Sequence, residues 1–140
     1  MANNVILGGF FLLLITIFFT DFKKREVSNY QVLVALFLCV VASFIFGYEL
    51  NYKLSLYALL IGFLLWKIKL FGAADVKLIC VYLLCIGQEN LIDFLFLMSV
   101  FGFFIGIFVL LFFKNKSVPY APAIATSHII IFYELYFKGL

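Results

Sequence analysis

The sequence predicts an all-α membrane protein, a polytopic bundle of about six transmembrane helices. Of the 140 residues, 67% are hydrophobic and only 12% are charged, and the mean hydropathy is +1.23. A soluble domain of this size could not bury so much apolar surface. The apolar residues also fall into six stretches joined by short polar segments, which leave no room for a separate soluble domain. We therefore expect one integral membrane domain over residues 1–140.

The six apolar stretches are the candidate spans. In order they are Val5–Thr20, Tyr30–Gly47, Leu54–Trp66, Val76–Gly87, Leu91–Phe113 and Pro119–Phe137. A span needs about 20 apolar residues, with a lower limit near 17. The third and fourth stretches are short by this measure, so they either include flanking polar residues or lie in a locally thinned bilayer. We predict six spans, and four or five remain as alternatives.

The basic residues predict the orientation, because cytoplasmic loops of membrane proteins are enriched in Lys and Arg. With the N-terminus outside, the turns that face the cytoplasm hold or adjoin most of the ten basic residues, namely Lys23, Lys24, Arg25, Lys67, Lys69, Lys77, Lys114 and Lys116. No basic residue precedes the first stretch and no small-residue cleavage site follows it, so we expect it to remain as an anchor. The net charge of +3 is too small and too scattered for a nucleic-acid surface. The expected location is the cytoplasmic membrane, with the lipid bilayer as a partner.

Two aspartates stand at the edges of these spans. Asp21 ends the first stretch and Asp75 opens the fourth, so the predicted topology places both at the cytoplasmic boundary. A carboxylate near hydrocarbon is costly unless it is compensated, which makes it a functional candidate by default. An aspartic hydrolase needs at least two such carboxyl groups held close together. The ordinary alternatives are that Asp21 pairs with the neighbouring basic cluster and that Asp75 is a helix N-cap.

The residues around the aspartates predict helix ends. Ser28 or Asn29 can cap the second helix. Gly72 permits a positive φ and a close approach of the backbone. Pro119 suits the first turn of the last helix.

The cysteines and the single histidine predict no metal site. Cys39, Cys80 and Cys85 all lie in apolar stretches and form no C-x-x-C pair, so we expect them to be small buried hydrophobes. His128 has no second metal-ligating residue at a useful spacing. We expect it to pack or to form an interhelical hydrogen bond.

Together, these segments resemble the type IV prepilin peptidases, membrane aspartic peptidases with a G-x-G-D motif. The similarity runs from about residue 12 to 125. Its first pattern is matched by Asp21, Val27, Ser28 and Asn29, its second by Gly72 and Asp75 followed by Val76, Lys77 and Leu78, and its third by Pro119, Tyr120 and Pro122. Ala74 departs from the pattern, because the family normally has glycine there. The short length is similar to the small subclass associated with tight-adherence pili, which has no cysteine-rich insert or methyltransferase segment.

The resemblance implies an aspartic endopeptidase with Asp21 and Asp75 as the catalytic pair and no cofactor. The residues expected to shape the site or bind substrate are Gly72, Ala74, Asn29, Lys77, Pro119 and Tyr120. The implied substrate is a pilin-like precursor, cut at the cytoplasmic face between its basic leader and its apolar helix.

The helix dipoles predict which aspartate holds the shared proton. Asp75 lies at a helix N-terminus, which favours negative charge, and Asp21 lies at a C-terminus, which does not. We therefore expect Asp21 to be the protonated partner.

Two other functions remain open at this point. The chain could be a non-catalytic membrane component of a pilus or secretion system, with Ala74 disabling the site. It could also be a small transporter subunit, although transport sites more naturally lie near the middle of the membrane.

Overall fold

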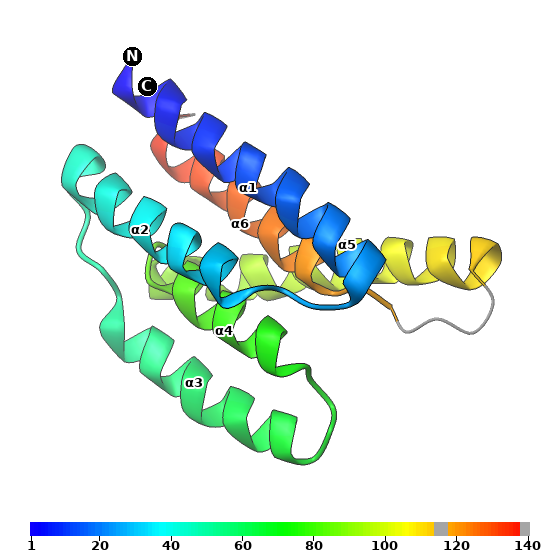
Figure 1. Ribbon diagram of the computed structural model, residues 1–140. Helices are drawn as coiled ribbons and strands as arrows, with labels where there is room; N and C mark the ends of the chain where they lie inside the picture. Colours follow the sequence, from blue (N-terminus) through cyan, green and yellow to red (C-terminus); the bar gives the residue numbers. More distant parts are fainter. Residues whose placement is uncertain (114–117, 138–140) are drawn as a thin grey trace.

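The computed structural model describes residues 1–113 and 118–137, and it confirms the all-α fold (Figure 1). Each predicted stretch contains one helix. The helices are α1 (Ala2–Lys24), α2 (Asn29–Phe46), α3 (Tyr52–Lys67), α4 (Ala73–Leu83), the 3-10 turn η1 (Gln88–Asn90), α5 (Leu91–Phe112) and α6 (Ala121–Tyr136). The single-domain organisation over residues 1–140 stays a prediction.

The short helix α4 lies at the centre of the bundle and packs against α2, α3 and α6. Helix α1 packs against α2 and α6, and Figure 1 shows α1 and α6 running side by side. Helix α5 packs mainly against α6. The core includes fully buried rings from α1, α4, α5 and α6, contributed by Phe10, Tyr82, Phe94 and Phe132.

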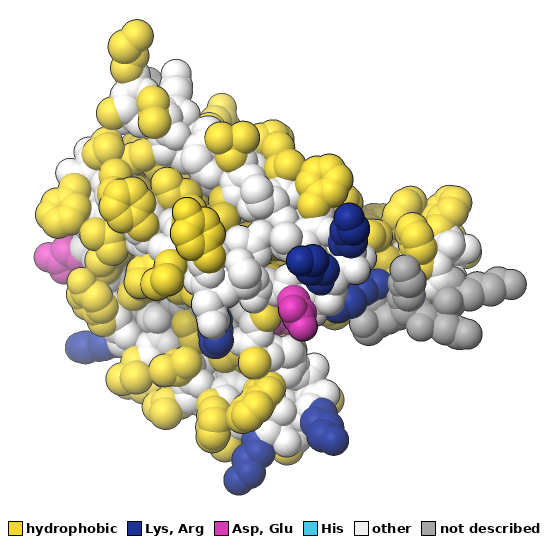
Figure 2. Space-filling model, in the orientation of Figure 1, with side chains coloured by type: hydrophobic (Ala, Val, Ile, Leu, Met, Phe, Trp, Pro, Cys, Tyr) yellow, Lys and Arg dark blue, Asp and Glu magenta, His cyan; other side chains and the backbone are white. Residues whose placement is uncertain are grey.

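Three of the described helices are long and apolar enough to cross a membrane. They cover Ala2–Lys24, Asn29–Phe46 and Gln88–Phe112. Helix α4 has 11 residues, which at 1.5 Å per residue is roughly 17 Å, against about 30 Å of hydrocarbon. Large hydrophobic side chains nevertheless cover much of the outer surface (Figure 2), as they do in a protein that contacts lipid. The count of six spans and the outside N-terminus therefore stay predictions.

The end of α1 is tied to the start of α2 by hydrogen bonds. Ser28 caps α2 as predicted: its Oγ accepts the backbone N–H of Gln31 at 3.3 Å, and the Ser28 backbone N–H donates to Gln31 Oε1 at 3.0 Å. The Gln31 amide also donates to Thr20 Oγ1 on α1 at 3.0 Å. Arg25, which follows α1, adopts the left-handed conformation with φ of 57°. This tight turn fixes the last turn of α1 beside the first turn of α2.

At three positions the structure differs from a local role that the sequence allowed. Gly72, not Asp75, is the N-cap of α4, so Asp75 occupies the third helical position, with its side chain in the first turn. Gly72 has an ordinary φ of −72°, so it does not use the positive-φ freedom of glycine. Pro119 precedes α6, and Pro122 is the proline in the first turn of that helix.

Candidate active site

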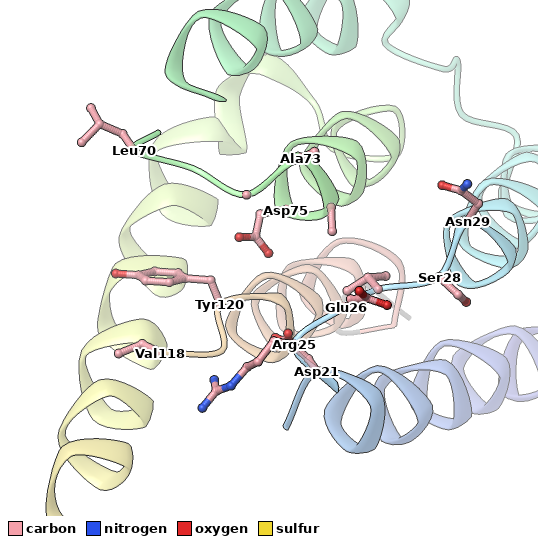
Figure 3. A pocket seen from close by; sticks show the side chains of 13 residues that line it. Asp21, Arg25, Glu26, Ser28, Asn29, Leu70, Ala73, Asp75, Val118 and Tyr120 are labelled. Atoms are coloured by element: carbon pink, nitrogen blue, oxygen red, sulfur yellow. The ribbon is translucent and has the colours of Figure 1, made fainter. Parts of the chain in front are cut away.

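A cavity of about 610 Å³ brings together residues from four helix ends. It lies between the end of α1, the turn before α2, the start of α4 and the segment before α6. Its lining residues are Asp21, Arg25, Glu26, Val27, Ser28, Asn29, Leu70, Gly72, Ala73, Ala74, Asp75, Val118 and Tyr120. Figure 3 shows the Asp75 carboxyl pointing from the start of α4 toward the start of α6, with Asp21 on the last turn of α1. The two aspartates therefore share one space, although 53 residues separate them in the sequence.

Asp21 is buried, with 7% of its surface exposed. Its Oδ2 accepts the backbone N–H of Ala121, the first residue of α6, at 3.2 Å. The first N–H groups of a helix have no partner within the helix and carry its positive dipole end. The start of α6 therefore offsets the unfavourable position of Asp21 at the end of α1.

Asp75 is half-buried, and its backbone partner is Gly72, the N-cap residue of its own helix. Burial and, second to it, the negative charge of Asp21 raise the pKa of Asp75 to about 6, against the opposing effect of the Gly72 backbone N–H. Burial also raises the pKa of Asp21, but Ala121 and then Arg25 pull it down. Asp21 directly follows the predicted apolar stretch 5–20, and Asp75 directly precedes the stretch 76–87.

The structure reverses the expected place of the proton. The prediction considered only the helix on which each aspartate sits and assigned the proton to Asp21. It missed α6, whose N-terminus approaches Asp21 from elsewhere in the chain. Burial raises the pKa of both carboxyls, but Ala121 and Arg25 favour the anion of Asp21, so Asp75 is the better holder of a shared proton.

Gly72 makes room for the Asp75 side chain. A Cβ on Gly72 would lie 3.0 Å from Asp75 Oδ2, closer than side chains usually approach. Ala74, where the resemblance expects glycine, lies in the first turn of α4, and the positive-φ residues of the described chain do not include it. The backbone at this position is therefore compatible with alanine, and the methyl group faces the cavity.

The other expected site residues are divided between the cavity and its surroundings. Asn29 lines the cavity, and its Oδ1 accepts a hydrogen bond from Lys77 Nζ at 2.9 Å. Lys77 itself is exposed and does not line the cavity. Pro119 is fully buried and does not line the cavity.

Tyr120 lines the cavity edge and turns its ring toward α5. The ring packs so closely on Gly102 that a Cβ there would lie 2.8 Å from it. The glycine therefore lets the segment before α6 approach α5.

Sequence reasoning treated Arg25 as an orientation signal and as part of the basic cluster that could pair with Asp21, and missed it as a cavity residue. Its side chain lines the cavity, and its buried Nη1 has no hydrogen-bond partner in the described part of the chain. A guanidinium group is a strong donor for carbonyl and carboxylate oxygens. The spacing of four residues from Asp21 on a helix was the signal that could have placed it there.

Comparison with known proteins identifies the family. Residues 9–107, which contain both aspartates, match the type IV leader peptidase family. The chain belongs to this family. The match ends before the Pro119–Tyr120 segment, and no curated protein or solved structure matches the chain.

Membership makes this chain a leader peptidase in the general sense, a hydrolase of a membrane family. The three helices suited to crossing a membrane agree with that assignment. The matched range contains both aspartates, and the cavity gives them a common space.

Proposed function

We propose that this leader peptidase is an aspartic endopeptidase that cleaves the basic leader from a pilin-like precursor at the cytoplasmic face of the cell membrane. The observation that carries the proposal is the shared cavity of Asp21 and Asp75, in which burial raises the pKa of Asp75 to about 6 and that of Asp21 by less, because the Ala121 N–H and Arg25 oppose the effect of burial on Asp21. Amide hydrolysis by two carboxyl groups needs this difference.

In the proposed reaction, the Asp21 carboxylate takes a proton from a water molecule, which attacks the scissile carbonyl carbon. Protonated Asp75 donates to the carbonyl oxygen. As the tetrahedral intermediate collapses, Asp21 delivers the proton that it took from water to the leaving nitrogen, and a hydroxyl group of the intermediate returns its proton to Asp75, so the pair again holds one proton. Arg25 lines the same cavity and is placed to bind a backbone carbonyl of the substrate.

An apolar groove beside the cavity provides a place for the apolar helix of the precursor. It has a volume of about 510 Å³ and lies between α3, α4 and α5. Its lining includes Phe71 and Val76, the chain neighbours of Gly72 and Asp75. The groove thus lies next to residues that adjoin the cavity in the chain, an arrangement that suits a substrate with a polar leader and an apolar helix.

The charge distribution supports a cytoplasmic site. In Figure 2, basic side chains gather near the end of α1 and the end of α3, while hydrophobic side chains are spread over much of the remaining visible face. These two helix ends adjoin the turns that lead to the cavity. By the positive-inside rule, this side of the bundle faces the cytoplasm.

The decisive experiment is co-expression with a pilin-like precursor, followed by mass measurement of the N-terminus of the precursor. The wild type should remove the leader, and Asp21→Asn and Asp75→Asn should each leave it intact. Asp93→Asn is the matched control, because Asp93 is an exposed acid on α5 outside the cavity. Processing by both cavity variants would overturn the aspartic mechanism, and no processing by the wild type would favour a non-catalytic assembly component.

The groove has its own test. Ala58 lines it, whereas Leu56 on the same helix is 55% exposed and lies outside it. Ala58→Trp should raise the KM for the precursor about tenfold, which corresponds to about 1.4 kcal/mol of lost binding. Leu56→Trp should leave KM unchanged. Equal effects of the two variants would remove the groove from the proposal.

A further inference from the structure

Two cysteines and the histidine meet in the core, at a distance from the aspartate cavity. Cys39 lies on α2, Cys85 follows the end of α4, and His128 lies on α6. The two sulfur atoms and a ring nitrogen all lie within 4.8 Å of one another, and all three residues are at most 2% exposed. Three potential metal ligands from three separate segments therefore converge on one point.

The imidazole ring of His128 is packed between aromatic rings, but its nitrogen atoms have no hydrogen-bond partner among the described residues. Its ring stacks on Tyr82 with a centroid distance of 4.1 Å and meets the edge of Phe10 at 4.8 Å. Neither ring nitrogen makes a hydrogen bond within the described part of the chain. Buried polar atoms nearly always have a partner, and each exception calls for an explanation such as an ion. Of the two roles expected for His128, these ring contacts confirm packing, and the interhelical hydrogen bond is not found among the described residues.

We propose that Cys39, Cys85 and His128 bind a single Zn²⁺ ion that joins α2, the end of α4 and α6. Thiolate sulfur and imidazole nitrogen are the ligands that zinc prefers, and Cys₂His with one further position is a known zinc arrangement. Zinc–sulfur bonds of about 2.3 Å and zinc–nitrogen bonds of about 2.0 Å require the side chains to close by roughly 1 Å from their present separations.

Charge balance selects a divalent ion. Metal-binding cysteines lose their protons, so two thiolates and a neutral imidazole carry two negative charges. Zn²⁺ cancels them, whereas a monovalent ion would leave a net charge among the buried rings, where it is costly. Binding converts two thiols to two zinc thiolates and releases two protons to solvent. One of these thiols, Cys39, now contacts the Val81 carbonyl oxygen at 3.7 Å.

The fourth zinc position has a candidate at the edge of the cluster. The Tyr48 hydroxyl donates to the Cys39 carbonyl oxygen at 3.1 Å, which places a phenol oxygen beside the Cys39 residue. This oxygen or a water molecule would complete a tetrahedral arrangement.

The position of the cluster, away from the aspartates, points to a structural role for the metal. Cys85 follows Asp75 by ten residues and His128 follows Ala121 by seven, so at 1.5 Å per residue the site lies about 10–15 Å from the aspartate cavity. The helices that it joins also begin at that cavity, with Asn29, Asp75 and Ala121 in their first turns. A zinc ion here would fix their relative positions.

The test uses the full chain purified in detergent after growth with added zinc, with metal content measured by inductively coupled plasma mass spectrometry. We expect about one zinc per chain in the wild type and in Cys80→Ser, the matched control, because Cys80 is a buried cysteine outside the cluster. Cys39→Ser, Cys85→Ser and His128→Gln should each lose the metal. Copper in place of zinc, or zinc retained by all three variants, would overturn the proposal.

A measurement on the wild type keeps the proposal testable if the variants fail to fold. Co²⁺ substituted for zinc should give the near-ultraviolet absorption of cobalt–thiolate bonds, and X-ray absorption of the zinc form should show two sulfur ligands. A zinc spectrum without sulfur ligands would contradict the site, as would a Cys39–Cys85 disulfide found by peptide mass spectrometry. These readouts do not depend on peptidase activity, so they can fail or succeed independently of the proposed function.

Discussion

The Asp21 carboxylate accepts a hydrogen bond from the backbone N–H of Ala121, at a nitrogen–oxygen distance of 3.2 Å and across 100 residues of sequence. The bond joins the last turn of α1 to the first turn of α6. It gives a buried acid a partner that no neighbouring residue supplies, and it makes Asp21 the better anion of the pair. The proposed division of roles between the two aspartates depends on this contact.

Loss of this contact should be visible in amide exchange. A first-turn N–H normally exchanges readily because it has no partner within its helix. Asp21→Ala removes the acceptor, so we expect the Ala121 amide to exchange at least about tenfold faster than in the wild type, equivalent to about 1.4 kcal/mol of lost protection. Asp21→Asn retains an oxygen acceptor and is the control. Equal exchange in the wild type and Asp21→Ala would contradict the contact.

The raised pKa of Asp75 predicts the alkaline limb of the pH profile. Asp75 acts in its protonated form, and its pKa is about 6, so kcat/KM should fall by about tenfold per pH unit above about pH 6. The profile belongs to the coupled pair and should be bell-shaped, with an acid limb where Asp21 becomes protonated. Measurement of kcat/KM across this range checks the assignment, and an alkaline limb that is flat to pH 9 would refute it.

Arg25 should control the acid limb. Its positive charge lowers the pKa of Asp21, so Arg25→Gln should raise that pKa and move the acid limb to higher pH. Lys24→Gln is a suitable control, because Lys24 is an exposed cation of the same helix end that does not line the cavity. If Arg25→Gln lowers kcat/KM equally at every pH, Arg25 binds substrate without tuning Asp21.

Asp75→Asn should stabilise the protein while it abolishes cleavage. The folded pKa of Asp75 lies above the unfolded value of 3.8, so ionised Asp75 destabilises the fold at pH values above about 6. The neutral amide removes this cost, and we expect about 1–3 kcal/mol of stabilisation at pH 7.5 and none at pH 4, where the acid is largely protonated. Thermal unfolding of the detergent-solubilised protein at the two pH values measures the difference. A lower Tm for Asp75→Asn than for the wild type at pH 7.5 would contradict the predicted stabilisation.

The two small residues before Asp75 should respond differently to a change of one methyl group. Gly72→Ala places a Cβ 3.0 Å from Asp75 Oδ2, so it should displace the carboxyl and reduce kcat at least about tenfold, about 1.4 kcal/mol in the barrier. Ala74→Gly should keep activity within about threefold and lower stability by up to about 1 kcal/mol, the usual cost of glycine in a helix. A large gain in activity from Ala74→Gly would mean that this alanine impairs the site.

Much of the architecture could be predicted because the hydropathy and the length of each helix are set by its own stretch of sequence. The apolar stretches are long enough to specify helices by themselves, and each contains one helix in the structure. The positions of Asp21 and Asp75 at the edges of two stretches also suggested one membrane side. Their burial and their common cavity required the packing of α1, α4 and α6.

Local sequence determined the helices and the acids at their ends, because a helix forms from contacts three and four residues apart. Only the tertiary structure decided which aspartate is the better proton holder, because the start of α6 reaches Asp21 from 100 residues away. The same holds for Cys39, Cys85 and His128, which resemble ordinary buried residues in the sequence and become neighbours only when α2, α4 and α6 pack together. Electrostatic interactions act through space, so the distances that set them are fixed only when the helices are assembled.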